Sequence, residues 1–180
     1  MIGDYLETLA NILPRVPREP IEEIVAVLQR ARHEGTRVLL IGNGGSAATA
    51  SHFVNDLLKG ATRLGQPRFK VMCLTDNVST LTAYANDAGY EMTFAEPLTA
   101  LAEVGDVVIA LSGSGNSPNV LRAMDAAKEL GLTRIGLTGF TGDKLRAKCE
   151  GCVVVPSDSM QIIEDAHLAI LHSIFREMCG

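Results

Sequence analysis

Short runs of consecutive apolar residues, rich in Val, Ile and Leu, alternate along this chain with segments whose apolar residues have helical spacing. Because these runs lack the polar alternation of a half-exposed strand, they predict strands buried on both faces of a parallel sheet. Strands that alternate with helices predict a doubly wound α/β fold with right-handed crossovers. The five expected strands are residues 37–41, 70–74, 107–111, 134–137 and 152–155.

Helices are expected on both faces of this sheet and ahead of its first strand. Two leading helices, at residues 5–13 and from 21 toward 32, are separated by a proline-rich stretch that suits helix boundaries but not helix interiors. The later helices are expected at residues 46–58, 79–85, 94–101, 118–130, 144–147 and 160–178. A chain of 180 residues has room for one such fold, so we expect a single domain over residues 1–180.

Charge and hydropathy exclude several classes of protein. The formal net charge is -5 and no cluster of Lys or Arg occurs, which argues against a nucleic-acid partner. The first residues lack the basic and apolar layout of a signal peptide, and no apolar run is long enough to span a membrane. We therefore expect a cytoplasmic protein with no membrane or nucleic-acid partner.

The spacing of the cysteines is not that of a disulfide framework. Cys149 and Cys152 form a C-x-x-C motif, but it runs into an expected strand, whereas redox motifs of this kind usually begin a helix. A zinc site would need two further ligands nearby. We interpret both cysteines as ordinary loop and core residues.

Two loops rich in Gly and Ser follow the first and third expected strands, at residues 42–46 and 112–117, and each opens a helical segment. Such a loop aims backbone N–H groups, hydroxyls and the positive end of a helix at one point, which suits a phosphate. In a doubly wound sheet both loops lie at the edge where ligands bind. The pair of loops therefore predicts a small phosphorylated ligand.

Both loops also have other interpretations. Residues 42–47 also match the G-x-G-x-x-A pattern of dinucleotide sites, which requires an acidic residue about 20 positions later at the end of a strand. That distance falls in an expected loop near Arg63, so we expect no nucleotide cofactor. The first loop can also be a turn needed only for tight packing, and the second a set of capping and turn residues.

Ionisable residues recur at helical spacing on two expected helices. His52 and Asp56 are four positions apart, and Glu164 and His172 are eight apart, so each pair shares one side of its helix. Together they can form a site for proton transfer or for a divalent metal. A single histidine is more commonly a surface residue or a satisfied core residue. His172, however, lies in an apolar stretch where an idle imidazole is unfavourable.

These motifs together resemble the SIS (sugar isomerase) domain, and within it the phosphoheptose isomerase family. The likeness covers nearly the whole chain and is most specific at residues 42–53, 84–87, 112–120 and 163–172. The resemblance implies a flavodoxin-like SIS fold. It also implies an aldose–ketose isomerase that converts sedoheptulose 7-phosphate to D-glycero-D-manno-heptose 7-phosphate by proton transfer between C1 and C2 through an enediol.

The resemblance further implies a role for each matching residue. Asp56 and His172 would be catalytic, and a possible Zn²⁺ would be bound by His52, Asp56, Glu164 and His172. The sugar and its phosphate would be contacted by Asn43, Gly44, Gly45, Ser46, Asp56, Asn86, Asp87, Ser112, Gly113, Ser114, Ser117 and Glu164. From the residues alone, Asn86 and Asp87 are equally well explained as a helix end followed by a turn.

This chain departs from the family pattern at three positions. Asp56 stands where the family usually has Glu, and Glu164 stands where it commonly has Gln. The arginine that typically follows the first of these carboxylates is missing, and Lys59 and Arg63 are the nearby basic residues.

The family resemblance also implies an assembly. Active sites in this family lie between subunits of a homotetramer, and we expect the leading helices of residues 1–34 and the apolar last helix to form the interface. The alternative is a non-catalytic relative that binds a phosphosugar as a regulator or binds proteins as an adaptor. Clustered ionisable groups usually have a chemical task, which favours the enzyme.

Overall fold

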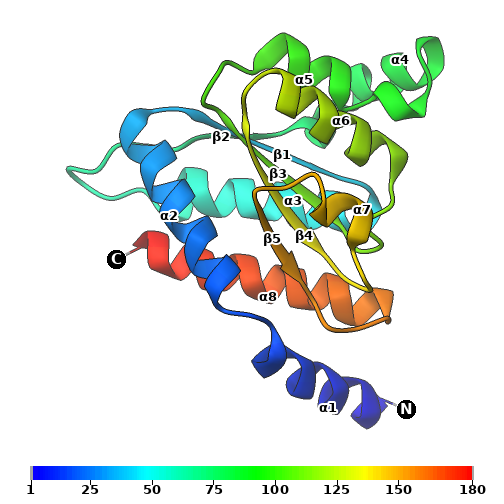
Figure 1. Cartoon of the computed structure of the whole chain (residues 1–180). Helices are drawn as coiled ribbons and strands as arrows, with labels where there is room; N and C mark the ends of the chain where they lie inside the picture. Colours follow the sequence, from blue (N-terminus) through cyan, green and yellow to red (C-terminus); the bar gives the residue numbers. More distant parts are fainter. Residues whose placement is uncertain (1, 180) are drawn as a thin grey trace.

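The computed structural model describes residues 2–179, which form a parallel sheet with helices on both faces (Figure 1). Its five strands lie in the order β2-β1-β3-β4-β5 and every neighbouring pair is parallel, which confirms the predicted doubly wound fold. Met1 and Gly180, which the predicted domain includes, lie outside the described residues. The strands are β1 (Arg37–Gly42), β2 (Lys70–Cys73), β3 (Val107–Ser112), β4 (Thr133–Thr138) and β5 (Gly151–Val154).

The helices divide between the two faces of the sheet. One face is covered by α2 (Glu19–Glu34), α3 (Gly44–Asn55) and α8 (Met160–Cys179), and the other by α4 (Val78–Asp87), α5 (Ala95–Leu101), α6 (Pro118–Glu129) and α7 (Asp143–Arg146) (Figure 1). The leading helix α1 (Ile2–Ile12) reaches the last helix, because Tyr5 Oη donates a hydrogen bond to Asp165 Oδ2 (2.7 Å). Among residues 2–179, no helix combines the length and the apolar composition that a bilayer span requires.

The central strands explain why the apolar runs are continuous. Side chains along a strand point alternately to its two faces, and here both faces are covered. Leu40 and Ile109 pack in the core beneath α2, α3 and α8, whereas Leu39 and Val108 pack in the core beneath α5 and α6. All four side chains are fully buried.

The strand order reverses between β1 and β3, because β2 lies on one side of β1 and the later strands lie on the other. Gly42 at the end of β1 pairs with Leu111 near the end of β3. The loops that follow these strands therefore emerge side by side at the carboxyl edge of the sheet, where doubly wound folds bind ligands.

The helix expected at residues 46–58 is interrupted. The α-helix α3 ends at Asn55, and a π-helical turn, η2 (Asp56–Gly60), follows it. The backbone N–H of Ala61 donates to the carbonyl O of Asp56 (2.9 Å) across this wider turn. A Cβ on Gly60 would lie 2.6 Å from Cζ of Phe175 in α8, so the close approach needs glycine. Because propensity does not predict a π turn, sequence reasoning continued the α-helix through Asp56.

Candidate active site

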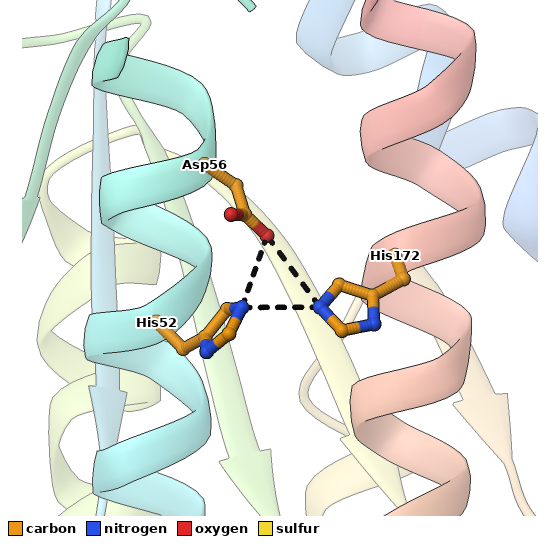
Figure 2. A group of neighbouring side chains, drawn as sticks. All are labelled: His52, Asp56 and His172. Atoms are coloured by element: carbon orange, nitrogen blue, oxygen red, sulfur yellow. Dashed lines mark hydrogen bonds and ion pairs between the residues drawn. The ribbon is translucent and has the colours of Figure 1, made fainter. Parts of the chain in front are cut away.

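His52, Asp56 and His172 converge in the space between α3 and α8 (Figure 2). The Nε2 atoms of the two histidines are 3.1 Å apart, and their rings meet edge to face with centroids 5.0 Å apart. Asp56 Oδ2 lies 3.5 Å from Nε2 of His52 and 3.7 Å from Nε2 of His172. Two helices far apart in sequence thus bring three potential ligand or proton-transfer groups to one point.

Burial within this cluster is uneven. The side chains of His52 and His172 are 48% and 46% exposed, whereas that of Asp56 is 14% exposed. Within the described part of the chain, the buried Oδ2 of Asp56 accepts no hydrogen bond. Two facing Nε2 atoms share one proton or direct two lone pairs at a common cation. The cluster is therefore open to a substrate and has acceptor capacity that the protein leaves unused.

Glu164 lies against the start of α3. A Cβ on Gly45 would be 2.5 Å from Oε2 of Glu164, so the absence of a side chain at residue 45 makes room for this carboxylate. The partial positive charge of a helix N-terminus favours a carboxylate there. Of the four predicted zinc ligands, the structure gathers His52, Asp56 and His172, and Glu164 lies outside that group.

The second loop, residues 112–117, has the features of an anion site. Ser112 Oγ and Ser117 Oγ are 3.2 Å apart, and Ser117 is the N-cap residue of α6. The backbone N–H groups of Ser114 and Ser117 donate no hydrogen bond to another described residue. Gly115 has a φ of 65°, which favours glycine. Hydroxyls and free N–H groups at a helix start can enclose a phosphate without a basic side chain.

A network of polar side chains ties the two loops together. Asn43 Nδ2 donates to Asn119 Oδ1 (2.9 Å), and Asn119 Nδ2 lies 2.9 Å from Asn43 Oδ1. Tyr90 Oη also donates to Asn43 Oδ1 (2.9 Å), and Asn119 Nδ2 lies 3.2 Å from Oγ1 of buried Thr93. Asn119 itself is 1% exposed. The network fixes the loop after β1 against the first turn of α6.

A cavity of about 430 Å³ opens beside this network. Asn43, Tyr90, Ser117 and Asn119 are among the residues that line it. Tyr90, Thr93 and Asn119 had no predicted role. For Asn119 the signals were the family likeness over residues 112–120 and an amide directly after the proline that starts α6, where Ser117 is the N-cap residue.

Other predicted contacts lie at the end of α4. Asn86 Nδ2 donates to Asp87 Oδ1 (2.7 Å), and both side chains are exposed. They shortly precede Gly89, which lines the same cavity. The predicted contact of Asn86 and Asp87 with the sugar stays a prediction.

Arg63 is engaged elsewhere. Its guanidinium donates to the carbonyl O atoms of Gly60 (2.9 Å), Thr62 (3.0 Å) and Cys179 (3.1 Å). These bonds join the segment after η2 to the end of α8. Arg63 thus joins two segments of the backbone, a structural role separate from the cluster of His52, Asp56 and His172.

A second histidine of α8, His167, has a different environment. It is 1% exposed, its Nε2 lies 3.2 Å from the carbonyl O of Thr138, and its Nδ1 has no partner among the described residues. Burial lowers the pKa of His167 to about 4. The ring is therefore neutral at neutral pH and packs where α8 meets the end of β4.

The fold and these two loops define a class of protein. The family model described as the SIS domain matches residues 4–139. The phosphoheptose isomerase of Aliarcobacter butzleri is 39% identical over 170 residues, which cover 94% of this chain and 89% of that protein. That of Rhodospirillum rubrum is 42% identical over 160 residues, which cover 89% of this chain and 82% of that protein.

Solved structures agree with these relatives. The phosphoheptose isomerase of Neisseria gonorrhoeae superposes with a TM-score of 0.91 at 28% identity, covering 98% of this chain and 96% of that chain. That of Francisella tularensis gives a TM-score of 0.92 at 29% identity, with coverage of 98% and 95%. The chain therefore belongs to the SIS domain family, within the group of phosphoheptose isomerases.

Proposed function

We propose that this protein is an aldose–ketose isomerase that interconverts sedoheptulose 7-phosphate and D-glycero-D-manno-heptose 7-phosphate. The observation that carries the proposal is the meeting of His52, Asp56 and His172 between two helices of a fold whose carboxyl edge holds the serine loop. The name shared by the curated relatives supports the same reaction class. A regulator that only binds a phosphosugar would have no use for a buried carboxylate oxygen of Asp56 that faces two histidines and accepts no hydrogen bond.

The serine loop provides the anchor in this mechanism. Hydroxyls of Ser112, Ser114 and Ser117 and the free N–H groups bind the phosphate, and Asn43, Gly44, Gly45, Ser46, Asn86, Asp87 and Glu164 contact the sugar. Binding energy at this remote end orients C1 and C2 for reaction.

Asp56 and His172 divide the proton transfers between them. Starting from the ketose, one group removes a proton from C1 while the other gives a proton to the carbonyl oxygen at C2, which yields the enediol. Return of a proton to C2 and loss of the proton from the C1 hydroxyl then give the aldose. The exposed position of His172 lets it exchange protons with solvent between turnovers.

The same three side chains can instead hold a divalent cation such as Zn²⁺. His52, Asp56 and His172 offer two nitrogen atoms and one oxygen atom within 4.8 Å of one another, and the Asp56 oxygen lacks a hydrogen bond. Three protein ligands with one open position are typical of catalytic zinc sites, where the ion polarises a carbonyl group. Glu164, the predicted fourth ligand, would stay at the start of α3.

We also propose a homotetramer with α1, α2 and α8 in the subunit interface. Ile2 and Leu6 of α1 are 82% and 60% exposed. An apolar groove of about 680 Å³ runs between α2 and α8, with Ile21, Val25 and Ile174 in its lining. Light scattering on the eluting protein should give a mass of four chains, and an active monomer would contradict this part of the proposal.

The test of function is an incubation of the purified protein with sedoheptulose 7-phosphate, and in parallel with pentulose and hexulose phosphates. We expect the heptose aldose to form, and the His172→Gln variant to form it at least about 100-fold more slowly at the same protein concentration. Binding of the heptulose phosphate without any product would make the protein a phosphosugar-binding regulator instead. If only a shorter ketose phosphate reacts, the protein is still an isomerase, but that shorter sugar is its substrate.

A further inference from the structure

Cys149 and Cys152 meet over a single glycine of the sheet. Cys152 in β5 pairs in register with Gly136 in β4, and Cys149 lies in the turn that leads into β5. A Cβ on Gly136 would stand 2.7 Å from Sγ of Cys149 and 3.2 Å from Sγ of Cys152. Both sulfur atoms therefore occupy the same small space, which exists because residue 136 has no side chain.

The turn that carries Cys149 and leads into β5 is held in place by Arg134 and Glu150. The backbone N–H of Arg134 donates to Glu150 Oε2 (2.5 Å), and its guanidinium forms an ion pair with Oε1 of the same side chain (2.5 Å). The backbone N–H of Glu150 donates in return to the carbonyl O of Arg134 (2.9 Å). The proximity of the sulfur atoms is thus fixed by strand pairing on one side and by this turn on the other.

The two thiols differ in their chemical character. Cys149 Sγ donates a hydrogen bond to the carbonyl O of Leu145 (3.1 Å). Its interaction with Cys152, together with burial, raises the pKa of Cys149. The interaction with Cys149, together with the positive charge of Arg146, lowers the pKa of Cys152 against the opposing effect of burial. Cys152 therefore has more thiolate, the reactive form, than Cys149.

The remaining cysteines have other surroundings. Cys73 is buried and its sulfur lies 2.7 Å from Oγ1 of Thr75. Cys179, which is half-buried, has its sulfur 3.8 Å from the carbonyl O of Gly60. Cys179 thus provides an internal reference for a half-buried thiol outside the pair.

We propose that Cys149 and Cys152 form a redox-active dithiol that a peroxide converts into an intramolecular disulfide. A low-pKa thiolate beside a resolving thiol is the arrangement of redox-sensing cysteines. The interpretation of both residues as ordinary loop and core cysteines, drawn from the solitary C-x-x-C motif, is the alternative that this proposal replaces. It is independent of the isomerase reaction.

The chemistry proceeds in two steps. The Cys152 thiolate attacks one peroxide oxygen, the O–O bond breaks, and the hydroxide that leaves takes up a proton to become water. Cys149 then loses its proton and attacks the sulfur of the Cys152 sulfenic acid, the S–O bond breaks, and a second water leaves. The two thiols are oxidised by two electrons and the peroxide is reduced. A dithiol reductant reverses the change.

The test combines hydrogen peroxide treatment of the whole protein, alkylation with N-ethylmaleimide and peptide mass mapping. Cleavage after Lys148 and Arg176 leaves Cys149 and Cys152 together in one peptide, apart from Cys73 and Cys179. We expect this peptide to escape alkylation and to be lighter by two hydrogen atoms than the reduced peptide, and dithiothreitol to restore both thiols. Cys179 should remain open to alkylation after the same treatment.

Two variants separate the roles of the cysteines. In Cys149→Ser the oxidation should stop at the Cys152 sulfenic acid, which dimedone traps. In Cys152→Ser the remaining thiol, Cys149, should react with peroxide much more slowly than Cys152 does in the parent protein. The Cys179→Ser variant is the matched control and should behave as the parent protein. Equal peroxide reactivity of Cys152 and Cys179, or a disulfide between two chains, would overturn the proposal. The two thiols could also resist alkylation before any peroxide is added, and a chelator could remove this resistance. That result would overturn the proposal and show that the two cysteines bind a metal.

Discussion

His167 and His172 lie on the same helix, α8, and have opposite environments. His167 is 1% exposed and its ring faces a main-chain carbonyl O, whereas the side chain of His172 is 46% exposed and faces His52 and Asp56. Where α8 packs on the sheet, burial keeps an imidazole neutral. Where α8 faces the end of α3 at the surface, the imidazole has an ionisable partner and access to solvent. Position on the helix therefore separates a buried imidazole from an accessible one that is placed for the proposed proton transfer.

The largest expected effect comes from His172. Replacing His172 with Gln removes a group that transfers protons, so kcat should fall by about 10²–10⁴-fold. Because the side chain is 46% exposed, the free energy of unfolding should stay within about 0.5 kcal/mol of the parent value. Steady-state kinetics and urea unfolding of the same preparation check both statements, and a variant that keeps most of its kcat would contradict the role of His172.

The sequence predicted the strands of the sheet better than it predicted how the cluster of His52, Asp56 and His172 assembles. The five strands were predictable because a continuous apolar run such as residues 38–41 is buried whichever strands lie beside it. The pairing of His52 with Asp56 follows from helical spacing alone. Their approach to His172 depends on how α3 packs on α8, and the Gly60 contact with Phe175 that supports this packing has no local signal.

The polar network was beyond sequence reasoning for the same reason. Asn43 and Asn119 follow different strands, and they meet only because β1 and β3 are neighbours in the sheet. Local patterns predicted that both loops reach one edge, but not which side chains pair across it. The position of Glu164 against Gly45 likewise depends on the packing of α8 on α3.

His167 predicts a specific dependence of stability on pH. Its pKa is about 4 in the folded protein, below the ordinary value of 6.5, so the unfolded chain binds more protons between these values. Stability from the neutral ring is complete above pH 6.5 and is lost as the pH falls toward 4. The loss amounts to about 3 kcal/mol over this window.

Urea unfolding at several pH values tests this dependence. The His167→Gln variant should show a flatter fall in unfolding free energy below pH 6.5 than the parent. Equal slopes for the parent and His167→Gln would show that the buried ring does not control acid stability.

A metal ion bound by the cluster of His52, Asp56 and His172 should stabilise the folded protein. Zn²⁺ at about 100 times its Kd raises the free energy of unfolding by about 2.7 kcal/mol when only the folded state binds it. The His52→Gln variant should lose this shift, and His167→Gln should keep it. Thermal unfolding with and without Zn²⁺ measures the effect, and an unchanged shift in His52→Gln would place the ion elsewhere.

A further effect on stability is expected from the amide pair of Asn43 and Asn119. Asn119→Ala leaves the Asn43 side chain without its buried partner, which costs about 1–3 kcal/mol. It should also raise KM, because the loop after β1 is no longer fixed against α6. The exposed Asn86 is the matched control, and Asn86→Ala should change stability by less than about 0.5 kcal/mol. A fully stable Asn119→Ala variant would show that the pair contributes little.

Proton transfer at the cluster of His52, Asp56 and His172 is the central proposal, and an isotope experiment measures it directly. The protein is incubated with sedoheptulose 7-phosphate in D₂O, and NMR follows the hydrogen bound to C2 of the heptose product. We expect deuterium at C2, in a product that the parent protein and the His167→Gln variant form readily and that His172→Gln forms at least about 100-fold more slowly. Equal product formation by His172→Gln and the parent would contradict it.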